Sequence, residues 1–344
     1  MVPTGDQIKR HARELGFDLV GITEPDPGSH AGFYRDWLSR GYHGEMSYLA
    51  RPDAVAKRAD PRRIMAETRS ILVVGMNYYQ GQHPPREAPV GRVSRYAWGA
   101  DYHDVVLTKL QQLADWIEGQ LAQPLACRAY VDTGPVLERG LGQRAGLGWI
   151  GKNTNLIHPR RGSYFFLGEL LLSLGLTPDP PFLSDRCGRC TACLDACPTG
   201  ALVAPRTLDA RQCISHLTIE HRGTIPTRVR PLLGDRVFGC DACQEACPWN
   251  HRFAHPTSEP AFGARQPTLD LAEVLTLDED GFRRRFRRTP LWRARRGGLL
   301  RNAAVVAGNL RDPVLLPVLR AAGSDPEPLV RQHAAWALRR IQRC

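Results

Sequence analysis

The sequence lacks any apolar segment long enough to cross a membrane. Its longest apolar stretch lies within residues 165–176, is interrupted by Glu169, and falls short of the roughly 20 residues that a membrane-spanning helix needs. The N-terminus also lacks the apolar core of a secretory signal and passes directly into a polar helical pattern. We therefore expect a cytoplasmic protein with no transmembrane helix and no membrane partner.

Cysteine is scarce outside one short segment. Eight of the ten cysteines lie between Cys187 and Cys247, and only Cys127 and Cys344 stand apart, so we interpret these two as ordinary packed or exposed residues. A chain of 344 residues in a reducing compartment does not favour a disulfide scaffold. The clustered thiols indicate metal ligation instead.

The composition excludes a disordered chain and favours an anionic partner. With 42% hydrophobic residues, the chain can bury a sizeable core and divide into two or three domains. Its formal net charge is +11, which suits nucleic acid or an anionic membrane surface. Charge alone does not distinguish between these two.

The hydrophobic periodicity predicts an α+β domain at the N-terminus. Helical and strand-like patterns alternate there, and the domain is expected to end at the proline-rich residues 177–181. The predicted helices cover residues 7–15 and 105–121, and the predicted strands cover 19–22, 71–79, 128–131 and 164–174.

Two further regions follow this domain. The cysteine-rich region is rich in turns, as expected where metal replaces part of a hydrophobic core. Near the C-terminus, residues 299–310 and 329–341 are self-similar at a spacing of 30 residues, which favours a HEAT-like helical tail over a plain amphipathic one. The predicted domains are residues 1–178, 179–255 and 256–344.

The first cysteine run has the spacing of a bacterial ferredoxin. In Cys187-x2-Cys190-x2-Cys193-x3-Cys197-Pro198, three close thiolates bind one 4Fe-4S cluster and the fourth cysteine ligates another. Zinc is the competing interpretation, but zinc sites normally use pairs of ligands at longer separations. The pattern therefore predicts a two-cluster module.

The second run is incomplete. It reads Cys240-x2-Cys243-x3-Cys247-Pro248, and Val237 stands where a full motif would have its first cysteine. If the last cysteines of the two runs are exchanged, only Cys213 remains to complete the second set. The predicted ligand sets are Cys187, Cys190, Cys193 and Cys247 for cluster one, and Cys197, Cys213, Cys240 and Cys243 for cluster two.

Such a module relays single electrons at low potential to a reduction elsewhere in the chain.

The segments around the cysteines resemble the epoxyqueuosine reductase family, and the segment CISHLTIEHRG (213–223) separates that family from generic ferredoxins. The resemblance extends to RYAWGADYHD (95–104), VDTGPVLER (131–139), GWIGKNTN (148–155) and GLLRN (298–302).

The resemblance implies a function and its cofactors. Members of this family reduce the epoxide of epoxyqueuosine, at the wobble position of a tRNA anticodon, to the alkene of queuosine. They use two 4Fe-4S clusters and cobalamin in a nitroreductase-like domain that is similar to reductive dehalogenases. By this resemblance, a Co(I) cobalamin attacks the epoxide while a side chain protonates the opening oxygen.

We expect base-off cobalamin without a histidine ligand. The Asp-x-His-x-x-Gly signature of His-on cobalamin proteins begins at Asp101-Tyr102-His103, but Val106 stands where its glycine would be. Asp101 and His103 remain candidate cofactor contacts, with a surface turn carrying a satisfied polar pair as the alternative.

The remaining candidates for the corrin pocket come from chemistry and from the resemblance. Asn153 and Asn155 match the amide arms of the ring, and Arg58 or Lys152 could meet the phosphate of the nucleotide loop. Three further contacts rest on the resemblance alone: Tyr96, His158 and Leu167.

Asp132 is the predicted proton donor. It follows an apolar strand and precedes Thr133-Gly134-Pro135, a strand end at which desolvation could keep a carboxyl protonated near neutral pH. An Asx-turn aspartate is the alternative interpretation.

A basic tract is the predicted tRNA surface. Between residues 283 and 301 the chain carries nine arginines, interleaved with Phe282, Phe286 and Trp292, a composition that suits phosphate binding with aromatic support. A solvated basic helix face with aromatics in the core is the alternative. We expect the modified base to be flipped into the cleft.

Two other functions use the same motifs. A reductive dehalogenase-like enzyme would act on a small molecule with the same cofactors, although such enzymes commonly carry a twin-arginine signal that this chain lacks. A nucleic-acid-binding protein with structural clusters would hold no corrinoid.

For the favoured function, the expected partners are tRNA carrying epoxyqueuosine and an unidentified low-potential electron donor, and the chain is expected to be a monomer.

Overall fold

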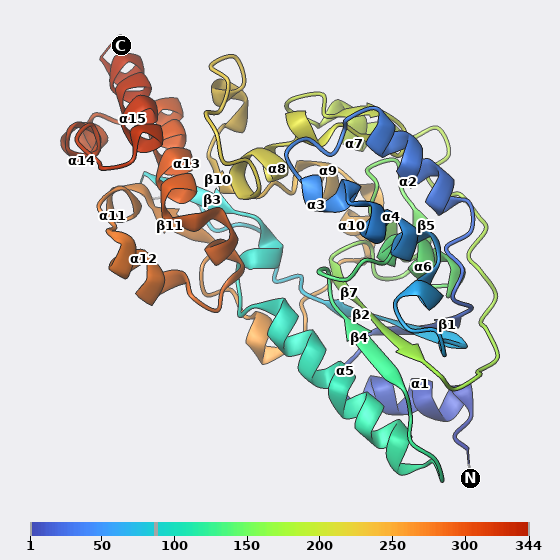
Figure 1. Ribbon diagram of the computed structural model, residues 1–344. Helices are drawn as coiled ribbons and strands as arrows, with labels where there is room; N and C mark the ends of the chain where they lie inside the picture. Colours follow the sequence, from blue (N-terminus) through green and yellow to red (C-terminus); the bar gives the residue numbers. More distant parts are fainter. Residues whose placement is uncertain (1, 86–88, 343–344) are drawn as a thin grey trace.

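The computed structural model describes residues 2–85 and 89–342, so Cys344 lies outside the described residues. Its centre is a four-stranded antiparallel sheet in the order β1-β2-β7-β4 (Figure 1). The two central strands are buried along most of their length, as β-branched and leucine-rich runs favour. The strands are β1 (Leu19–Thr23), β2 (Ser70–Asn77), β7 (Phe165–Leu172) and β4 (Cys127–Tyr130).

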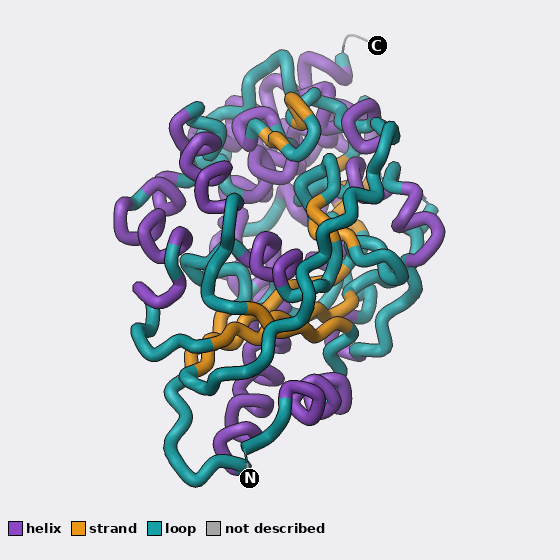
Figure 2. The backbone as a smooth tube through the Cα atoms, turned by 90° about the vertical axis from the view of Figure 1, so that its right-hand side faces the viewer, coloured by secondary structure: helices purple, strands orange, loops and turns teal. Residues whose placement is uncertain are grey.

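Helices cover both faces of this sheet. Helices α1 (Gly5–Glu14) and α5 (Tyr102–Gly119) pack on the face that carries the even-numbered side chains of β2 and β7, and both views place them together on one side (Figures 1 and 2). Helix α6 (Glu138–Arg144) covers the odd-numbered face. Since successive strand residues point to opposite faces, Glu169 of β7 lies on the α6 side.

The six elements predicted for the N-terminal domain are all present, with ends that differ by no more than three residues. The pattern missed the helices between residues 30 and 59. Helices α2 (His30–Ser39) and α3 (Ser47–Ala50) contain no fully buried residue, so they show no apolar periodicity that a sequence pattern could detect.

A small mixed sheet in the order β10-β3-β11 connects distant parts of the chain. Strand β3 (Val90–Val93) comes from the N-terminal region, β10 (Arg236–Phe238) from the cysteine-rich region and β11 (Thr268–Asp270) from the C-terminal region. One hydrophobic cluster contains residues of all three regions. The boundaries at residues 178 and 255 therefore divide segments that share a core, and they stay a prediction.

The C-terminal region is helical, as predicted. Helices α13 (Arg295–Leu310) and α15 (Pro328–Ile341) contain the two self-similar segments, and α14 (Leu316–Ala322) lies between them in the chain. Gly308 allows α13 to lie against α15, because a side chain there would meet Trp336 and the backbone of Ala337. In residues 2–85 and 89–342, no helix combines the length and apolarity that a bilayer crossing requires.

The other elements are short. The helices are α4 (Pro52–Ala59), α7 (Ala192–Asp195), α8 (Ile214–Ile219), α9 (Ala242–Glu245), α10 (Pro248–Phe253), α11 (Leu271–Leu275) and α12 (Glu279–Phe286). The strands are β5 (Trp149–Ile150), β6 (Leu156–Ile157), β8 (Leu202–Ala204) and β9 (Thr207–Leu208). The 3-10 turns are Pro61–Arg63, Arg95–Ala97, Ala210–Gln212, Arg230–Leu233, Pro260–Phe262, Pro290–Ala294 and Pro313–Leu315.

Candidate active site

Asp132 lies in the loop that follows β4, with a backbone φ of +57°. This left-handed conformation is uncommon for a residue other than glycine, although Asp and Asn adopt it more readily than most. The hydroxyl of Tyr102 donates to Asp132 Oδ2 at 2.7 Å. The backbone N–H of Asp132 donates to Glu138 Oε1 at 2.7 Å. Residues from α5 and α6 thus hold the loop from both sides.

His103 connects Asp132 with Asp101. Asp101 caps α5 by accepting from the backbone N–H of His103, and its Oδ1 lies 2.7 Å from His103 Nδ1. The other ring nitrogen, Nε2, lies 3.6 Å from Asp132 Oδ2. The predicted cofactor contacts Asp101 and His103 therefore belong to the same group as the predicted acid.

Asp132 is ionised in this arrangement. Burial acts to raise the pKa of Asp132, but the neighbouring His103, whose Nε2 lies 3.6 Å from Oδ2, and the hydrogen bond from Tyr102 hold it below its ordinary value. Burial likewise acts to lower the pKa of His103, yet its bonds to Asp101 and Asp132 raise it to about 9. The expectation that desolvation keeps Asp132 protonated is thus wrong, because flanking donors outweigh burial. At neutral pH the proton resides on the imidazole of His103.

Asp132 lies in a recess. Its side chain is 60% exposed, and Tyr102, His103 and Glu138 border it from α5 and α6, so solvent reaches a carboxyl that protein borders on two sides. The rings of Tyr102 and Tyr96 meet edge to face at 6.1 Å. We call this site the Asp132 recess; its residues are Tyr96, Tyr102, His103, Asp132 and Glu138.

The recess adjoins the cysteine-rich region through Tyr96. The ring of Tyr96 lies 6.1 Å from that of Phe238, and a side chain at Gly239 would approach Tyr96 to 3.4 Å. The next residue along the chain is Cys240. The second cysteine run therefore begins one residue after a backbone position that contacts the wall of the recess.

The first predicted thiol set is mutually close. Burial is the largest cause that raises the pKa of the Cys193 thiol, and the charges of Cys187, Cys247 and Cys190 raise it further. Burial also raises the pKa of Cys247, and the charges of Cys187 and Cys190 contribute to that rise. Cys190 is exposed, so this set lies at the surface.

The second predicted set lies deeper. Burial raises the pKa of Cys240 to about 11, and Cys213 contributes to the rise. Burial also raises the pKa of Cys213, with Cys197 contributing. Burial raises the pKa of Cys243 as well, and the charges of Cys213, Cys240 and Cys193, the last from the first set, contribute to the rise. The two sets are therefore adjacent to each other.

Donor groups point at several of these sulfur atoms. The indole N–H of Trp149 lies 3.4 Å from Cys187 Sγ. Backbone N–H groups also approach the sulfurs of Cys213, Cys240 and Cys247. Hydrogen bonds to sulfur stabilise ligating thiolates and tune the potential of iron-sulfur clusters.

Both predicted phosphate contacts have defined positions. The guanidinium of Arg58 lies over the ring of Tyr34 at 5.5 Å, and its charge lowers the pKa of Glu138, so Arg58 lies near the recess. Lys152 Nζ donates to the carbonyls of Gly188 and Cys190. It is therefore engaged by the first cysteine run, which leaves Arg58 as the better placed phosphate contact.

Asn153 is buried, and its amide donates to the carbonyl of Cys243 at 3.4 Å. It also accepts from the backbone N–H of Asn155 at 3.3 Å. Leu167 points from β7 toward α6, since a side chain at Gly142 would lie 3.9 Å from it. Asn153 therefore contacts the cysteine-rich region, whereas Leu167 lies on the α6 face of the sheet.

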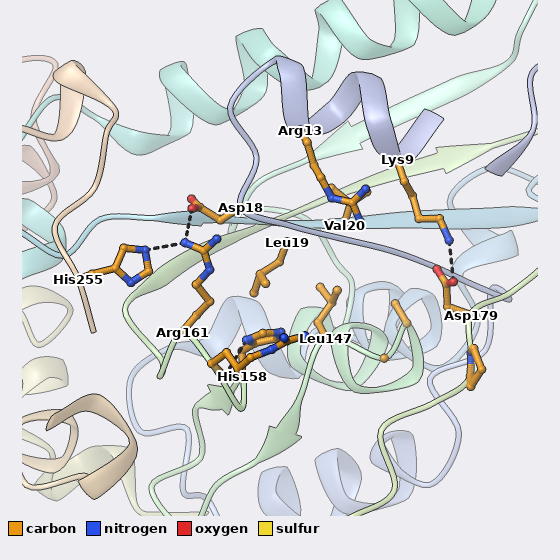
Figure 3. A pocket seen from close by; sticks show the side chains of 14 residues that line it. Lys9, Arg13, Asp18, Leu19, Val20, Leu147, His158, Arg161, Asp179 and His255 are labelled. Atoms are coloured by element: carbon orange, nitrogen blue, oxygen red, sulfur yellow. Dashed lines mark hydrogen bonds and ion pairs between the residues drawn. The ribbon is translucent and has the colours of Figure 1, made fainter. Parts of the chain in front are cut away.

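His158 lies elsewhere. It lines a cavity of about 930 Å³ at the β1 edge of the sheet, which no residue of the Asp132 recess lines. In Figure 3 this cavity is flanked by an Arg161–Asp18 pair on one side and a Lys9–Asp179 pair on the other. The structure thus does not bring His158 together with the other predicted cofactor contacts.

The segment 213–223 connects the recess, the thiols and the C-terminal helices. Arg301 is fully buried, and its guanidinium donates to the carbonyls of Leu217, His221 and Gly223. Asn302 bridges the carbonyls of Thr218 and Val237. This distinctive sequence therefore places Cys213 against a helix distant in the chain.

The arginine tract is partly internal. Arg301 and Arg296 are buried, and Arg296 pairs with Asp325 and Glu327. Phe282 and Phe286 are also buried, so the expectation that they support RNA is wrong: an amphipathic α12 turns them into the core. The exposed arginines are Arg283, Arg284, Arg285, Arg287, Arg288, Arg293 and Arg295.

The exposed part of the tract lies near the recess. Arg293 pairs with Glu220 at 2.8 Å and lies over the ring of Tyr48 at 5.9 Å. Burial and the charge of Glu220 raise the pKa of Tyr48, and the charge of Asp132 contributes to the rise. Tyr48, which is 41% exposed, therefore lies between the tract and the acid.

Eight clustered cysteines in ferredoxin-like spacing, near a recess that carries an acid, are typical of one class of protein: an iron-sulfur oxidoreductase. Family comparisons agree with this class. A family described as "4Fe-4S double cluster binding domain" matches residues 186–250, and one described as "Epoxyqueuosine reductase QueG, DUF1730" matches residues 58–133.

Individual proteins extend the likeness over the whole chain. An epoxyqueuosine reductase of Pseudomonas aeruginosa is 47% identical over 97% of this chain and 93% of its own length. The Escherichia coli enzyme is 40% identical over 96% of this chain and 88% of its own. A crystal structure of epoxyqueuosine reductase with a tRNA-Tyr epoxyqueuosine-modified stem loop has a TM-score of 0.90 and 32% identity, covering 98% of this chain and 89% of that one.

This chain belongs to the epoxyqueuosine reductase family. It is an oxidoreductase with an iron-sulfur module.

Structure shows which functional residues the sequence patterns missed. Tyr102 lies between Asp101 and His103, and Glu138 lies within the VDTGPVLER motif, but no recognisable motif spacing marked either residue as part of a site. Glu169 did leave a signal, because a lone acid interrupts an otherwise apolar strand.

Proposed function

We propose that this enzyme reduces the epoxide of epoxyqueuosine within a tRNA anticodon to the alkene of queuosine. One observation carries the proposal: the Asp132 recess lies between the deeper thiol set and the exposed arginine tract, so electrons, protons and a polyanion converge on it. The tRNA stem loop bound to the similar crystal structure supports the same substrate.

Within the recess, Asp132 and His103 act as one proton-donating pair. Asp132 is the group that the solvent-accessible recess presents to substrate, while the imidazolium of His103 holds the proton behind it. Tyr102 fixes the carboxylate by donating to Oδ2. As the epoxide oxygen gains charge, the pair transfers its proton to that oxygen.

The recess residues fit cobalamin in its base-off form. Both ring nitrogens of His103 face carboxylates, so neither is available as a cobalt ligand, and Val106 is buried in α5 where the His-on signature requires glycine. Arg58 would meet the phosphate, and Asn155 and Leu167 would contact the corrin. When bound, the cofactor supplies a strongly nucleophilic metal centre for epoxide opening. His158 is not supported as a contact.

The eight cysteines hold two 4Fe-4S clusters in the exchanged arrangement. The influence of Cys247 on the pKa of Cys193, and of Cys213 on the pKa of Cys240, supports it. Because Cys190 is exposed and Cys240 adjoins Tyr96, electrons from a low-potential donor enter at cluster one and reach the recess through cluster two.

Direct conversion tests the proposed function. The protein is reconstituted anaerobically with iron, sulfide and cobalamin, reduced chemically, and mixed with tRNA that carries epoxyqueuosine. Mass spectrometry of the nucleosides should show queuosine. Absence of queuosine from protein with both clusters and bound corrinoid would contradict the proposal.

Replacing Arg284, Arg287 and Arg288 by Ala should weaken tRNA binding. These exposed arginines have no ion pair among the residues that the structure describes, so their charge is available to phosphates. The slope of log K against log salt should fall by about 0.7 to 0.9 for each lost phosphate contact. Filter binding at several salt concentrations measures it.

A matched variant separates local contacts from net charge. Arg10 and Arg13 on α1 and Arg128 on β4 are also exposed, and they lie away from α12 (Figure 1). Their replacement by Ala removes the same charge and should leave the slope nearly unchanged. Equal slopes for both triple variants would move the tRNA site away from the tract.

Single-turnover conversion should slow as the pH rises through about 9. The pKa of His103 is raised to about 9 by Asp101 and Asp132, so the imidazolium persists at neutral pH and is lost above that value. The measurement is the single-turnover rate of chemically reduced enzyme from neutral to alkaline pH. A rate that stays constant well beyond pH 9 would remove His103 as the proton reserve.

A further inference from the structure

The reaction requires a second proton. Reducing an epoxide to an alkene takes two electrons and two protons, because the oxygen leaves as water. The Asp132–His103 pair holds one proton at neutral pH, since Asp132 is ionised and His103 is charged. On the proposed function, another group near the recess must therefore supply one proton per turnover.

Glu169 is an anomaly in the core. It lies in the middle of β7 with no exposed surface, and neither carboxyl oxygen has a hydrogen-bond partner among the described residues. An ionised carboxylate in such a place would be very costly, and burial raises the pKa of Glu169 far above its ordinary value, with help from Glu138 and Asp132. Glu169 therefore carries a proton at neutral pH.

The fold places Glu169 behind the recess. It is the register partner of Tyr130 on β4, the strand from which the Asp132 loop departs. Helix α6 packs over the same face of β7. Glu138, in the first turn of α6, accepts from the backbone N–H of Asp132.

Glu138 lies between the core and the recess. Burial and the charge of Asp132 raise the pKa of Glu138 to about 7, against the backbone hydrogen bond from Asp132 and the charges of Arg139 and Arg58. No side-chain ion pair to Glu138 or Glu169 is present in the described part of the chain. A carboxyl with a pKa near neutrality can both take up and release a proton.

We infer that Glu138 and Glu169 form a proton relay that supplies the second proton of the reaction. Glu138 passes its proton to the Asp132 carboxylate, which delivers it to the departing oxygen, and Glu169 reprotonates Glu138. The hydroxyl leaves as water, and both electrons come from the low-potential donor through the clusters. After product release, solvent that reaches the exposed Asp132 restores the protons of Glu138 and Glu169 by the same route in reverse. Both glutamates are positioning residues, since they act through Asp132.

An infrared measurement tests the protonated state without turnover. Protein lacking corrinoid should show C=O stretching bands of neutral carboxylic acids at neutral pH, and the spectrum of the native protein minus that of Glu169→Gln should contain one such band. Glu259→Gln is the matched control, because Glu259 is paired with Lys109 at 3.1 Å and its replacement should leave these bands unchanged. A difference spectrum for Glu169→Gln that contains no such band would overturn the inference.

Kinetics test the transfer. Single-turnover conversion at neutral pH should slow about 10- to 100-fold in Glu138→Gln and in Glu169→Gln, at the lower end of positioned acid–base effects because water replaces the relay slowly. The variant rates should rise in proportion to proton concentration, whereas the native rate should not. Glu169→Asp, which keeps a carboxyl, should recover part of the rate and serves where Glu169→Gln folds poorly.

The outcomes separate this inference from the proposed function. Exposed Glu118, at the far end of α5, provides the activity control as Glu118→Gln. Native rates in both glutamate variants, together with a slow Asp132→Asn, would overturn the relay and leave the proposed function intact. A native rate in Asp132→Asn would overturn the proposed function itself.

Discussion

Asp132→Asn is expected to lose roughly 10²- to 10⁴-fold in epoxide turnover, the range typical of a positioned general acid. The amide keeps the size of the side chain and can still accept from Tyr102, but it cannot transfer a proton. Asn also tolerates the left-handed φ of +57° at this position, so the loop should fold normally. The measurement is single-turnover conversion by chemically reduced enzyme, which bypasses electron transfer between the clusters.

Binding measurements give this prediction its specificity. Asp132→Asn should retain iron, corrinoid and tRNA affinity. Asp104→Asn is the matched control, since Asp104 is an exposed carboxylate two residues after Tyr102 on the same helix, and it should turn over normally. Near-native turnover of Asp132→Asn would remove Asp132 from the mechanism, and loss of bound cobalamin would make it a pocket residue instead.

The sheet and its helices could be predicted because their chemistry is local. Strands β2 and β7 are buried apolar runs, and α5 carries an apolar stripe of Val106, Leu110 and Leu113. Such periodicity depends only on neighbours in sequence. The small β10-β3-β11 sheet joins residues about 145 and about 178 positions apart, so no local pattern could indicate it.

The site was predictable only in part for a similar reason. Asp132 and the cysteines lie in motifs, whereas the protonation of Asp132 depends on Tyr102 and His103, which are brought to it by a different element. Burial suggested a neutral carboxyl, and hydrogen bonds from α5 reversed that conclusion. Likewise, composition alone could not separate the buried Arg296 and Arg301 from their exposed neighbours, because burial is decided by packing against Asp325 and the segment 213–223.

The cysteine motifs make a second prediction with a large effect. Cys213→Ala should remove the fourth ligand of cluster two and halt electron delivery to the recess, while cluster one survives. Cys247→Ala should instead damage cluster one, although Cys247 belongs to the second cysteine run. Both predictions follow from the exchange of Cys197 and Cys247 between the clusters. Cys127→Ala is the control, since Cys127 lies in β4 away from either set.

Electron paramagnetic resonance of the reduced variants distinguishes the two clusters. If the ligands are exchanged, the spectrum of Cys213→Ala should match that of Cys197→Ala, and the spectrum of Cys247→Ala should match that of Cys193→Ala. The deeper cluster adjoins Tyr96, so Cys213→Ala should also abolish conversion driven by a protein donor. If Cys213→Ala and Cys247→Ala lose the same signal, both cysteines bind one cluster and the exchange is wrong.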